Sequence, residues 1–187
     1  MKKLFIILFI SIPQIIFAQT LTEKIKYIQD QYQQAQEIAS KKGSDEWMEN
    51  MCYTLDLSSK INFSGPGPVL HDVEVFLTRM PESYEFDSGV FNTFAPILVK
   101  MTRKAAFNIY HEMLFDDKTG ELLFYYQHLP DFQGDGTIEM RYYYDKGKLI
   151  KSEPAYTEHL YLLPPKIAAE KAQALKAVVK NYNTLAD

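Results

Sequence analysis

The sequence predicts an α+β domain in which an antiparallel β-meander sheet of about six strands is flanked by an N-terminal and a C-terminal helix. Three observations support this prediction. Apolar residues recur at helical spacing near both ends of the chain, they alternate with polar residues between positions 51 and 152, and turns rich in Asp and Gly separate the alternating stretches. Because the strands are grouped together and the helices stand at the ends, we expect both helices on one face of the sheet.

The first 18 residues have the pattern of a cleavable secretory signal peptide. Two lysines precede an apolar run, and the small Ala18 stands before the expected cleavage point. Pro13 and Gln14 interrupt the run, which leaves it shorter than the ~18 apolar residues that a membrane-spanning helix usually needs. We therefore expect a signal peptide at 1–18 and a single α+β domain at 19–187. The location would be periplasmic or secreted, with no stable membrane span after cleavage.

The composition narrows the classes of function and of stabilisation. The formal net charge is −4 at pH 7, and removing the two lysines of the signal peptide takes it to −6. Such a surface disfavours nucleic acid, whose phosphate backbone needs a basic patch. Cys52 is the only cysteine, so no intramolecular disulfide can form. Stability must therefore come from a hydrophobic core, and a chain of this length buries roughly 70 per cent of its unfolded surface.

The segment after the signal peptide is predicted to be a helix. Its apolar residues recur three and four positions apart, as on one face of a helix. They are Leu21, Ile25, Ile28, Tyr32, Ala35 and Ala39. Thr20 or Thr22 is suited to cap the start of the helix, and Gly43, which follows two lysines, supplies a stop.

Two strands and a long loop are expected next. Residues 51–57 and 69–77 alternate between apolar and polar side chains, with a Gly-Pro-Gly-Pro break between them. Residues 80–96 show no clean period and are predicted to form a loop. Because long loops in compact domains are often functional, residues 82–92 are a candidate part of a binding site.

From residue 97 to residue 152 the pattern predicts a meander of antiparallel strands. Turns are expected at 116–120, 131–136 and 145–147. Acidic residues supply hydrogen-bond acceptors in these turns, and glycines accommodate positive φ angles. The three turns would join the strands into three successive hairpins.

A last helix is predicted to begin at Pro164 and Pro165, since proline is tolerated at the first helical position. Its apolar stripe is expected to face the sheet, and a row of lysines is expected to face away. The stripe comprises Ile167, Leu175, Val178, Val179 and Tyr182. The outer row comprises Lys166, Lys171, Lys176 and Lys180.

No motif predicts a metal or cofactor site. Residues 131–136 resemble the start of a calcium loop, but the twelfth position is Tyr142, where a bidentate glutamate is needed. The histidines show no zinc-site spacing. His71 and His111 lie on apolar strand faces, which predicts structural, hydrogen-bonded histidines. Glu112 follows His111 and must point to the opposite face. We therefore expect no cofactor and no bound metal.

Aromatic residues concentrate on two strands that we expect to pair. The first and third tyrosines of the run 142–144 are expected to face the core, which turns Tyr143 and Arg141 outward. Tyr125 is expected beside Tyr143, so Tyr125, Arg141 and Tyr143 are the candidate binding residues. Apolar, tyrosine-rich surfaces suit protein contacts or stacked sugar rings. The alternative is that a terminal helix covers this second face.

The sequence favours an exported, non-enzymatic binding or accessory protein whose partner is a protein or a glycan. The export signal, the aromatic sheet and the lack of nucleophile or phosphate-loop motifs support this hypothesis. The alternative is a periplasmic or secreted hydrolase. Its site would be assembled from distant residues such as His71, His111, Asp72 and Glu112. A third hypothesis is an envelope component that assembles with copies of itself through edge strands or the N-terminal helix.

Overall fold

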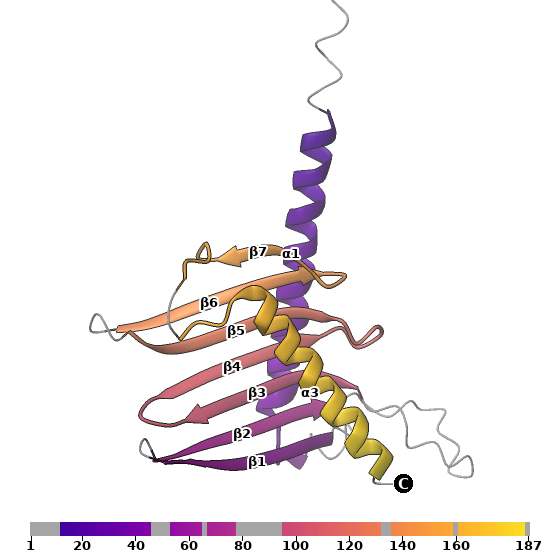
Figure 1. Ribbon diagram of the computed structural model, residues 1–187. Helices are drawn as coiled ribbons and strands as arrows, with labels where there is room; N and C mark the ends of the chain where they lie inside the picture. Colours follow the sequence, from indigo (N-terminus) through magenta and orange to yellow (C-terminus); the bar gives the residue numbers. More distant parts are fainter. Residues whose placement is uncertain are drawn as a thin grey trace, which may run out of the picture.

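The computed structural model describes residues 12–45, 53–64, 67–77, 95–131, 136–158 and 161–185, with side chains described between residues 20 and 181. These residues form one sheet that lies between two helices (Figure 1). The helices are α1 (Ile12–Ser40) and α3 (Pro165–Leu185). The strands are β1 (Tyr53–Phe63), β2 (Gly67–Leu77), β3 (Pro96–Lys104), β4 (Asn108–Phe115), β5 (Leu122–Asp131), β6 (Gly136–Asp145) and β7 (Lys148–Glu153).

The seven strands pair antiparallel in sequence order, which confirms the predicted meander and the α+β class. The sheet thus has seven strands where about six were expected. In the β4–β5 turn, the Asp116 carboxylate accepts hydrogen bonds from the backbone N–H groups of Lys118 (3.0 Å) and Thr119 (2.7 Å). The β6–β7 turn places Lys146 and Gly147 at φ 51° and 73°. This left-handed conformation suits a tight hairpin between twisted strands.

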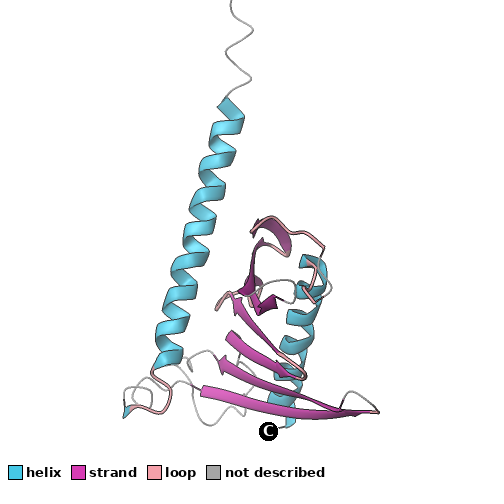
Figure 2. Ribbon diagram, turned by 90° about the vertical axis from the view of Figure 1, so that its left-hand side faces the viewer, coloured by secondary structure: helices cyan, strands magenta, loops and turns pink. Residues whose placement is uncertain are grey.

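The two helices lie on opposite faces of the sheet, so the expectation of both helices on one face is wrong (Figure 2). The cause lies in the central strands, which are buried at successive positions: residues 111–115 and 122–125 are all buried. On β4, Met113 packs in the cluster beneath α3 and Leu114 in the cluster beneath α1. A strand that is apolar on both sides needs cover on both sides.

The helix α1 crosses the strands from the β6 end of the sheet to the β1 end (Figure 1). Its buried residues pack against one apolar row of the sheet. This cluster comprises Ile28, Ala35, Ala39, Phe76, Leu98, Leu114, Leu123, Phe124 and Tyr143. Lys24 pairs with Asp145 near one end of the crossing, and Lys42 pairs with Glu74 (2.5 Å) and Asp56 (3.1 Å) near the other. Exposed ion pairs of this kind contribute little energy, so apolar packing provides most of the attachment.

The start of α1 differs from the prediction and its end agrees with it. The helix runs unbroken through Thr20 and Thr22, so the expectation that one of them caps its start is wrong. The last helical residue is Ser40, and Gly43 follows with φ 80°. Glycine adopts this left-handed conformation without strain, as expected for a residue just after a helix.

The helix α3 contacts the opposite face through small residues. Ala168 and Ala172 are fully buried, and their short side chains let the helix approach the sheet closely. The sheet residues beneath it form the larger of the two cores. They include Val75, Val99, Met101, Met113, Leu129, Met140, Tyr125, Tyr142 and Tyr144. The tyrosines at 142 and 144 thus face the core, as predicted.

Two of the buried tyrosines also hold the chain segment that leads into α3. The Tyr142 hydroxyl donates to the carbonyl of Leu163 (2.8 Å), and the Tyr144 hydroxyl donates to the carbonyl of Pro165 (2.7 Å). A buried tyrosine hydroxyl needs such a partner. These bonds set where the helix begins on the sheet.

The orientation of α3 differs from the predicted one. Ile167 and Val178 were expected to face the sheet, but they are 43% and 45% exposed. Lys171 and Lys176 were expected to face away, but Lys171 is half-buried and Lys176 donates to the carbonyl of Gly120 (2.6 Å). Val179 and Leu175 do pack against the sheet, as predicted, but the rest of the contact is made by the alanines.

Several features predicted from the sequence lie outside the described residues. They are positions 1–11 of the expected signal peptide, Cys52, the candidate loop at 82–92, and positions 132–135 of the expected calcium-like turn. In the described part of the chain, neither helix combines the length and the apolar character needed to cross a membrane.

The close approach of α3 predicts that enlarging its buried alanines destabilises the protein. Ala172→Leu should lower the free energy of unfolding by about 1–3 kcal/mol, because the side chain has no space beneath the helix. Ala174→Leu, at an exposed position of the same helix, is the matched control and should change it by less than about 0.5 kcal/mol. Urea unfolding measures both. Equal effects would contradict the described packing.

Candidate functional site

The three candidate residues from the sequence do not form one exposed surface. Tyr125 is directly opposite Tyr142 on the α3 side, whereas Tyr143 is directly opposite Phe124 on the α1 side. Tyr125 is 0% exposed and Tyr143 is 3% exposed. The expected outward pair of Tyr125 and Tyr143 is therefore wrong, and the alternative, cover by a terminal helix, describes both positions. Arg141 alone of the three is half-exposed.

The α1 face of the sheet is covered over only part of its width. Strand register places three successive rows of side chains across the strands on this face. The row beneath α1 is apolar: Phe76, Leu98, Leu114, Phe124 and Tyr143. The next row, two residues further along each strand, is Glu74, Lys100, Glu112, Tyr126 and Arg141. The third row is Asp72, Thr102, Tyr110, His128 and Glu139.

Beyond α1, this face presents a patch of half-exposed aromatic and charged side chains, which we call the open face. It is defined by Thr102, Tyr110, Tyr126, His128, Glu139 and Arg141. The sequence placed the exposed tyrosine of β5 at 125, one residue from its actual position. A shift of one residue moves a strand side chain to the other face of the sheet.

Contacts within the open face hold its side chains in place. The Arg141 guanidinium lies 5.4 Å from the centre of the Tyr126 ring and 2.5 Å from the Glu139 carboxylate. The Tyr126 and His128 rings are nearly parallel, with centres 6.5 Å apart, and Tyr110 meets Tyr126 edge-on at 6.4 Å. Partial burial and the Glu139 charge raise the pKa of Tyr126, so this phenol stays protonated at neutral pH. These contacts restrict the positions that the side chains of the patch can take.

A buried carboxylate joins the open face to α1. Glu112 is 5% exposed and accepts hydrogen bonds from the hydroxyls of Tyr32 and Tyr110 and from the Gln36 amide (2.6 Å). Burial and the bond to this carboxylate raise the pKa of both tyrosines. Tyr32 and Gln36 lie one helical turn apart on α1. The network therefore links α1, through Glu112, to Tyr110 at the edge of the open face.

A charged hollow of about 490 Å³ continues the open face toward β1. Tyr110 and Thr102 belong to both surfaces. Ion pairs line the hollow, such as the one between Lys104 and Asp72 (2.6 Å). The open face and the hollow together form a surface with aromatic side chains at its centre and polar side chains around them. Many protein-binding surfaces have this composition.

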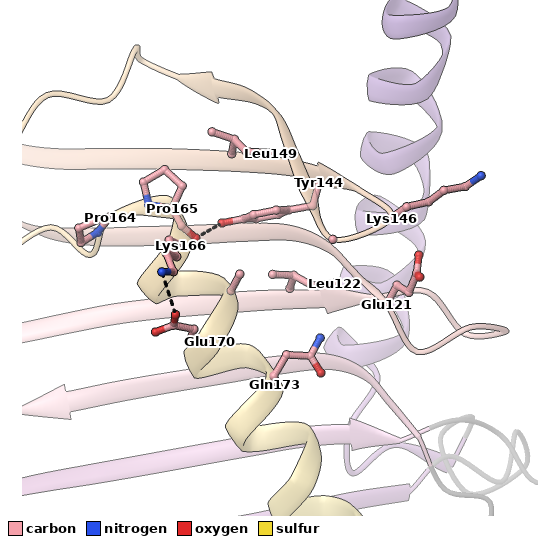
Figure 3. Close-up of a pocket in the computed structure, with 12 residues that line it drawn as sticks. Glu121, Leu122, Tyr144, Lys146, Leu149, Pro164, Pro165, Lys166, Glu170 and Gln173 are labelled. Carbon is pink, nitrogen blue, oxygen red and sulfur yellow. Dashed lines mark hydrogen bonds and ion pairs between the residues drawn. The ribbon is translucent and has the colours of Figure 1, made fainter.

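A second, more apolar pocket of about 860 Å³ lies where α3 begins (Figure 3). Its apolar lining is Leu122, Tyr144, Leu149, Pro164, Pro165 and Ala169. The Tyr144 hydroxyl is directed to the Pro165 carbonyl, and Lys166 and Glu170 face each other at 4.0 Å (Figure 3). Ligand pockets of this size usually add polar groups that fix a ligand's orientation. Here Tyr144, Lys166 and Glu170 already contact one another or the backbone, and Glu121, Lys146 and Gln173 complete the polar lining.

The residues of the hypothetical hydrolase site are divided between the two faces. His71 and His111 lie on the α3 side, and Asp72 and Glu112 lie on the α1 side, as the alternation of strand residues requires. His111 is 2% exposed, and its Nδ1 lies 3.1 Å from the Tyr125 hydroxyl. The prediction of a structural, hydrogen-bonded His111 is thus confirmed. The four residues cannot act on one substrate.

Metal-ligating side chains are not gathered at one point of the described structure. Among the residues with described positions, no group of three or more His, Cys, Asp or Glu is placed to hold a metal ion. Tyr142, at the twelfth position of the calcium-like motif, is fully buried beneath α3.

Comparison with known proteins identifies no relative. No family model matches the chain, and neither a curated protein nor a solved structure matches it significantly. The function must therefore be argued from the described surfaces alone.

The Glu112 network predicts a large cost for removing the carboxylate. Glu112→Ala leaves two tyrosine hydroxyls and one amide without their buried acceptor, and should lower the free energy of unfolding by about 2–4 kcal/mol. Glu121→Ala, at an exposed position before β5, is the control and should cost less than about 0.5 kcal/mol. Guanidinium unfolding compares the two. A near-zero cost at Glu112 would show that the network does not stabilise α1 on the sheet.

The burial of His111 predicts that the folded protein loses stability in mild acid. Burial and the nearby positive charges of Lys171, Arg103 and His71 lower its pKa from 6.5 to about 3 in the folded protein, where the Tyr125 hydroxyl is its neutral partner. The unfolded chain then binds a proton below about pH 6.5 that the folded chain does not, so the free energy of unfolding falls as the pH falls. Chemical unfolding between about pH 7 and about pH 4.5 measures this slope.

Two histidine variants test the assignment of that slope. His111→Gln should reduce the slope, because glutamine does not titrate; His71, whose pKa is also lowered, would keep part of it. His128→Gln, on the open face, is the comparison variant, and the slope should fall more in His111→Gln than in this variant. If both variants keep the slope of the parent protein, another group is responsible.

Proposed function

We propose that this chain is an exported binding protein that holds a protein partner on the open face. The observation that carries the proposal is that α1 covers only part of its side of the sheet. The uncovered part displays Tyr110, Tyr126, His128 and Arg141 side by side. Tyrosine and arginine are enriched among the residues that contribute most to binding energy at protein interfaces.

The arrangement favours a protein over a sugar. Sugar rings stack on a free aromatic face, but one neighbour of the Tyr126 ring is the Arg141 guanidinium and another is the nearly parallel His128 ring. A protein partner can instead contact the ring edges and the polar groups around them. The ion pairs of Glu139 with Arg141 and of Asp72 with Lys104 supply a polar rim.

The open face also has the rigidity that reduces the entropic cost of binding. Its side chains come from paired strands, and Tyr110 is held by the Glu112 carboxylate. An ordered surface loses less conformational freedom when a partner docks. Binding therefore requires no rearrangement of this face.

Export remains part of the proposal and rests on the pattern of residues 1–18. The contacts of α1 with the sheet include those of Lys24 and Ile25. Cleavage after Ala18 would remove none of those contacts. The folded sheet and its open face would then be available in the periplasm or outside the cell.

Site-specific photo-cross-linking in the source cell tests the proposal. The full chain would carry benzoylphenylalanine in place of Thr102 on the open face, or in place of Val178 on the exposed side of α3 as the control. We expect one saturable protein adduct from position 102 and none from position 178. A glycan adduct, a second copy of this chain, or equal labelling at both positions would each contradict the proposed partner.

Once captured, the partner allows the binding residues to be tested. Tyr126→Ala should weaken its affinity by about tenfold or more, as expected for a tyrosine that contributes strongly to an interface. Val178→Ala is the control and should leave the affinity unchanged. Circular dichroism and the melting temperature check that each variant is folded. An unchanged affinity in a folded Tyr126→Ala protein would exclude the open face as the interface.

A further inference from the structure

Four basic side chains gather on the α3 side of the sheet, away from the open face. Register places His71 of β2 directly opposite Arg103 of β3. His111 of β4 is directly opposite Met101, two residues from Arg103. Lys171 of α3, on the same side of the sheet, is near enough for its charge to lower the pKa of both histidines. Lys171, Arg103 and His71 are half-buried, whereas His111 is buried.

These groups are close enough to affect one another's protonation. Burial and the Arg103 charge lower the pKa of the Lys171 amine to about 8. Burial and the charges of Lys171 and Arg103 lower the pKa of His71, against an opposing effect of Asp72. At neutral pH most Lys171 amines therefore remain protonated beside the Arg103 guanidinium, and His71 is largely neutral.

Arg103 and Lys171 have no acidic partner in the part of the chain that the structure describes. Within those residues neither Arg103 nor Lys171 forms an ion pair or a side-chain hydrogen bond, and no carboxylate raises the pKa of Lys171. Asp72 projects from the opposite face and pairs with Lys104. Four other lysines near the sheet have carboxylate partners. They are Lys24, Lys42, Lys104 and Lys151.

We propose that Arg103, Lys171 and His71 bind a tetrahedral oxyanion, namely a phosphate or sulfate group. The Arg103 guanidinium offers a planar pair of N–H donors, and the Lys171 ammonium offers a point charge on a flexible chain. Both suit the oxygens of phosphate and sulfate. The Nδ1 of His71 lies 3.4 Å from the Ser59 hydroxyl, which leaves Nε2 for the anion. Bound anion would offset the repulsion between the two half-buried cations. This site is on the other face from the proposed partner surface and does not depend on it.

Histidine NMR of the purified protein tests the proposal directly. Inorganic phosphate is added at constant ionic strength, with sodium chloride replaced in step, while the imidazole signals are followed. The His71 signal should shift with a saturable profile, and the signal of His128, on the opposite face, is the internal control and should not. A His71 shift that is linear, or that acetate reproduces equally, would reflect charge screening and would overturn the site.

A charge-removing variant identifies the donor from α3. Lys171→Met keeps the length of the side chain and should weaken phosphate binding by about tenfold or more, since a hydrogen bond to a charged group is lost. Lys118→Met, in the exposed β4–β5 turn, is the control and should bind as the parent protein does. Equal affinity of a folded Lys171→Met protein would overturn the assignment. Should that variant not fold, Arg103→Gln replaces it with the same expected loss.

A second titration distinguishes a free anion from an esterified one. Glycerol 3-phosphate and inorganic phosphate carry the same tetrahedral group, and only the first resembles a phosphate attached to a larger molecule. Saturable His71 shifts with either probe support the site, and the smaller dissociation constant identifies which form it prefers. Saturation with neither would exclude a phosphate site.

Discussion

The Glu112 carboxylate, held by Tyr32, Gln36 and Tyr110, is the contact on which the arrangement of the α1 face depends. A buried carboxylate must keep its hydrogen-bond donors, so the position of α1 over the sheet is restricted to one that brings Tyr32 and Gln36 to β4. Apolar packing supplies most of the attachment energy, but it is less directional. The network therefore determines how much of the sheet the helix covers and where the open face begins.

The two faces of the sheet are attached to their helices in different ways. On the α3 side, short alanines allow a close approach over large buried side chains, and tyrosine hydroxyls hold the chain before the helix. This face is a core with a basic cluster beside it. On the α1 side, one apolar row lies beneath the helix and two increasingly polar rows extend beyond it. A meander covered unequally on its two sides can thus provide a stable core and a binding surface at once.

The sequence predicted the order of the helices and strands well, but it predicted poorly which face of an element each side chain occupies. The turns at Asp116 and at Lys146-Gly147 were recognised because their residues act locally. The exposed tyrosine of β5 was placed at 125 and is in fact at 126, because adjacent positions are both aromatic and alternation alone does not say which faces the core. The half-buried position of Lys171 was missed because Ile167 and Val178 suggested a different contact face from the one that Ala168, Ala172 and Val179 form.

Turn chemistry and residue periodicity are properties of short segments, so they were enough to predict the α+β class, the antiparallel hairpins and the two terminal helices. They did not predict which face each helix covers, which tyrosines remain accessible or which basic residues lie together. These features depend on strand register and on where a helix docks, and both bring together residues far apart in the chain. Tyr110, Tyr126 and Arg141 form one surface, and His71, Arg103 and Lys171 another, for that physical reason.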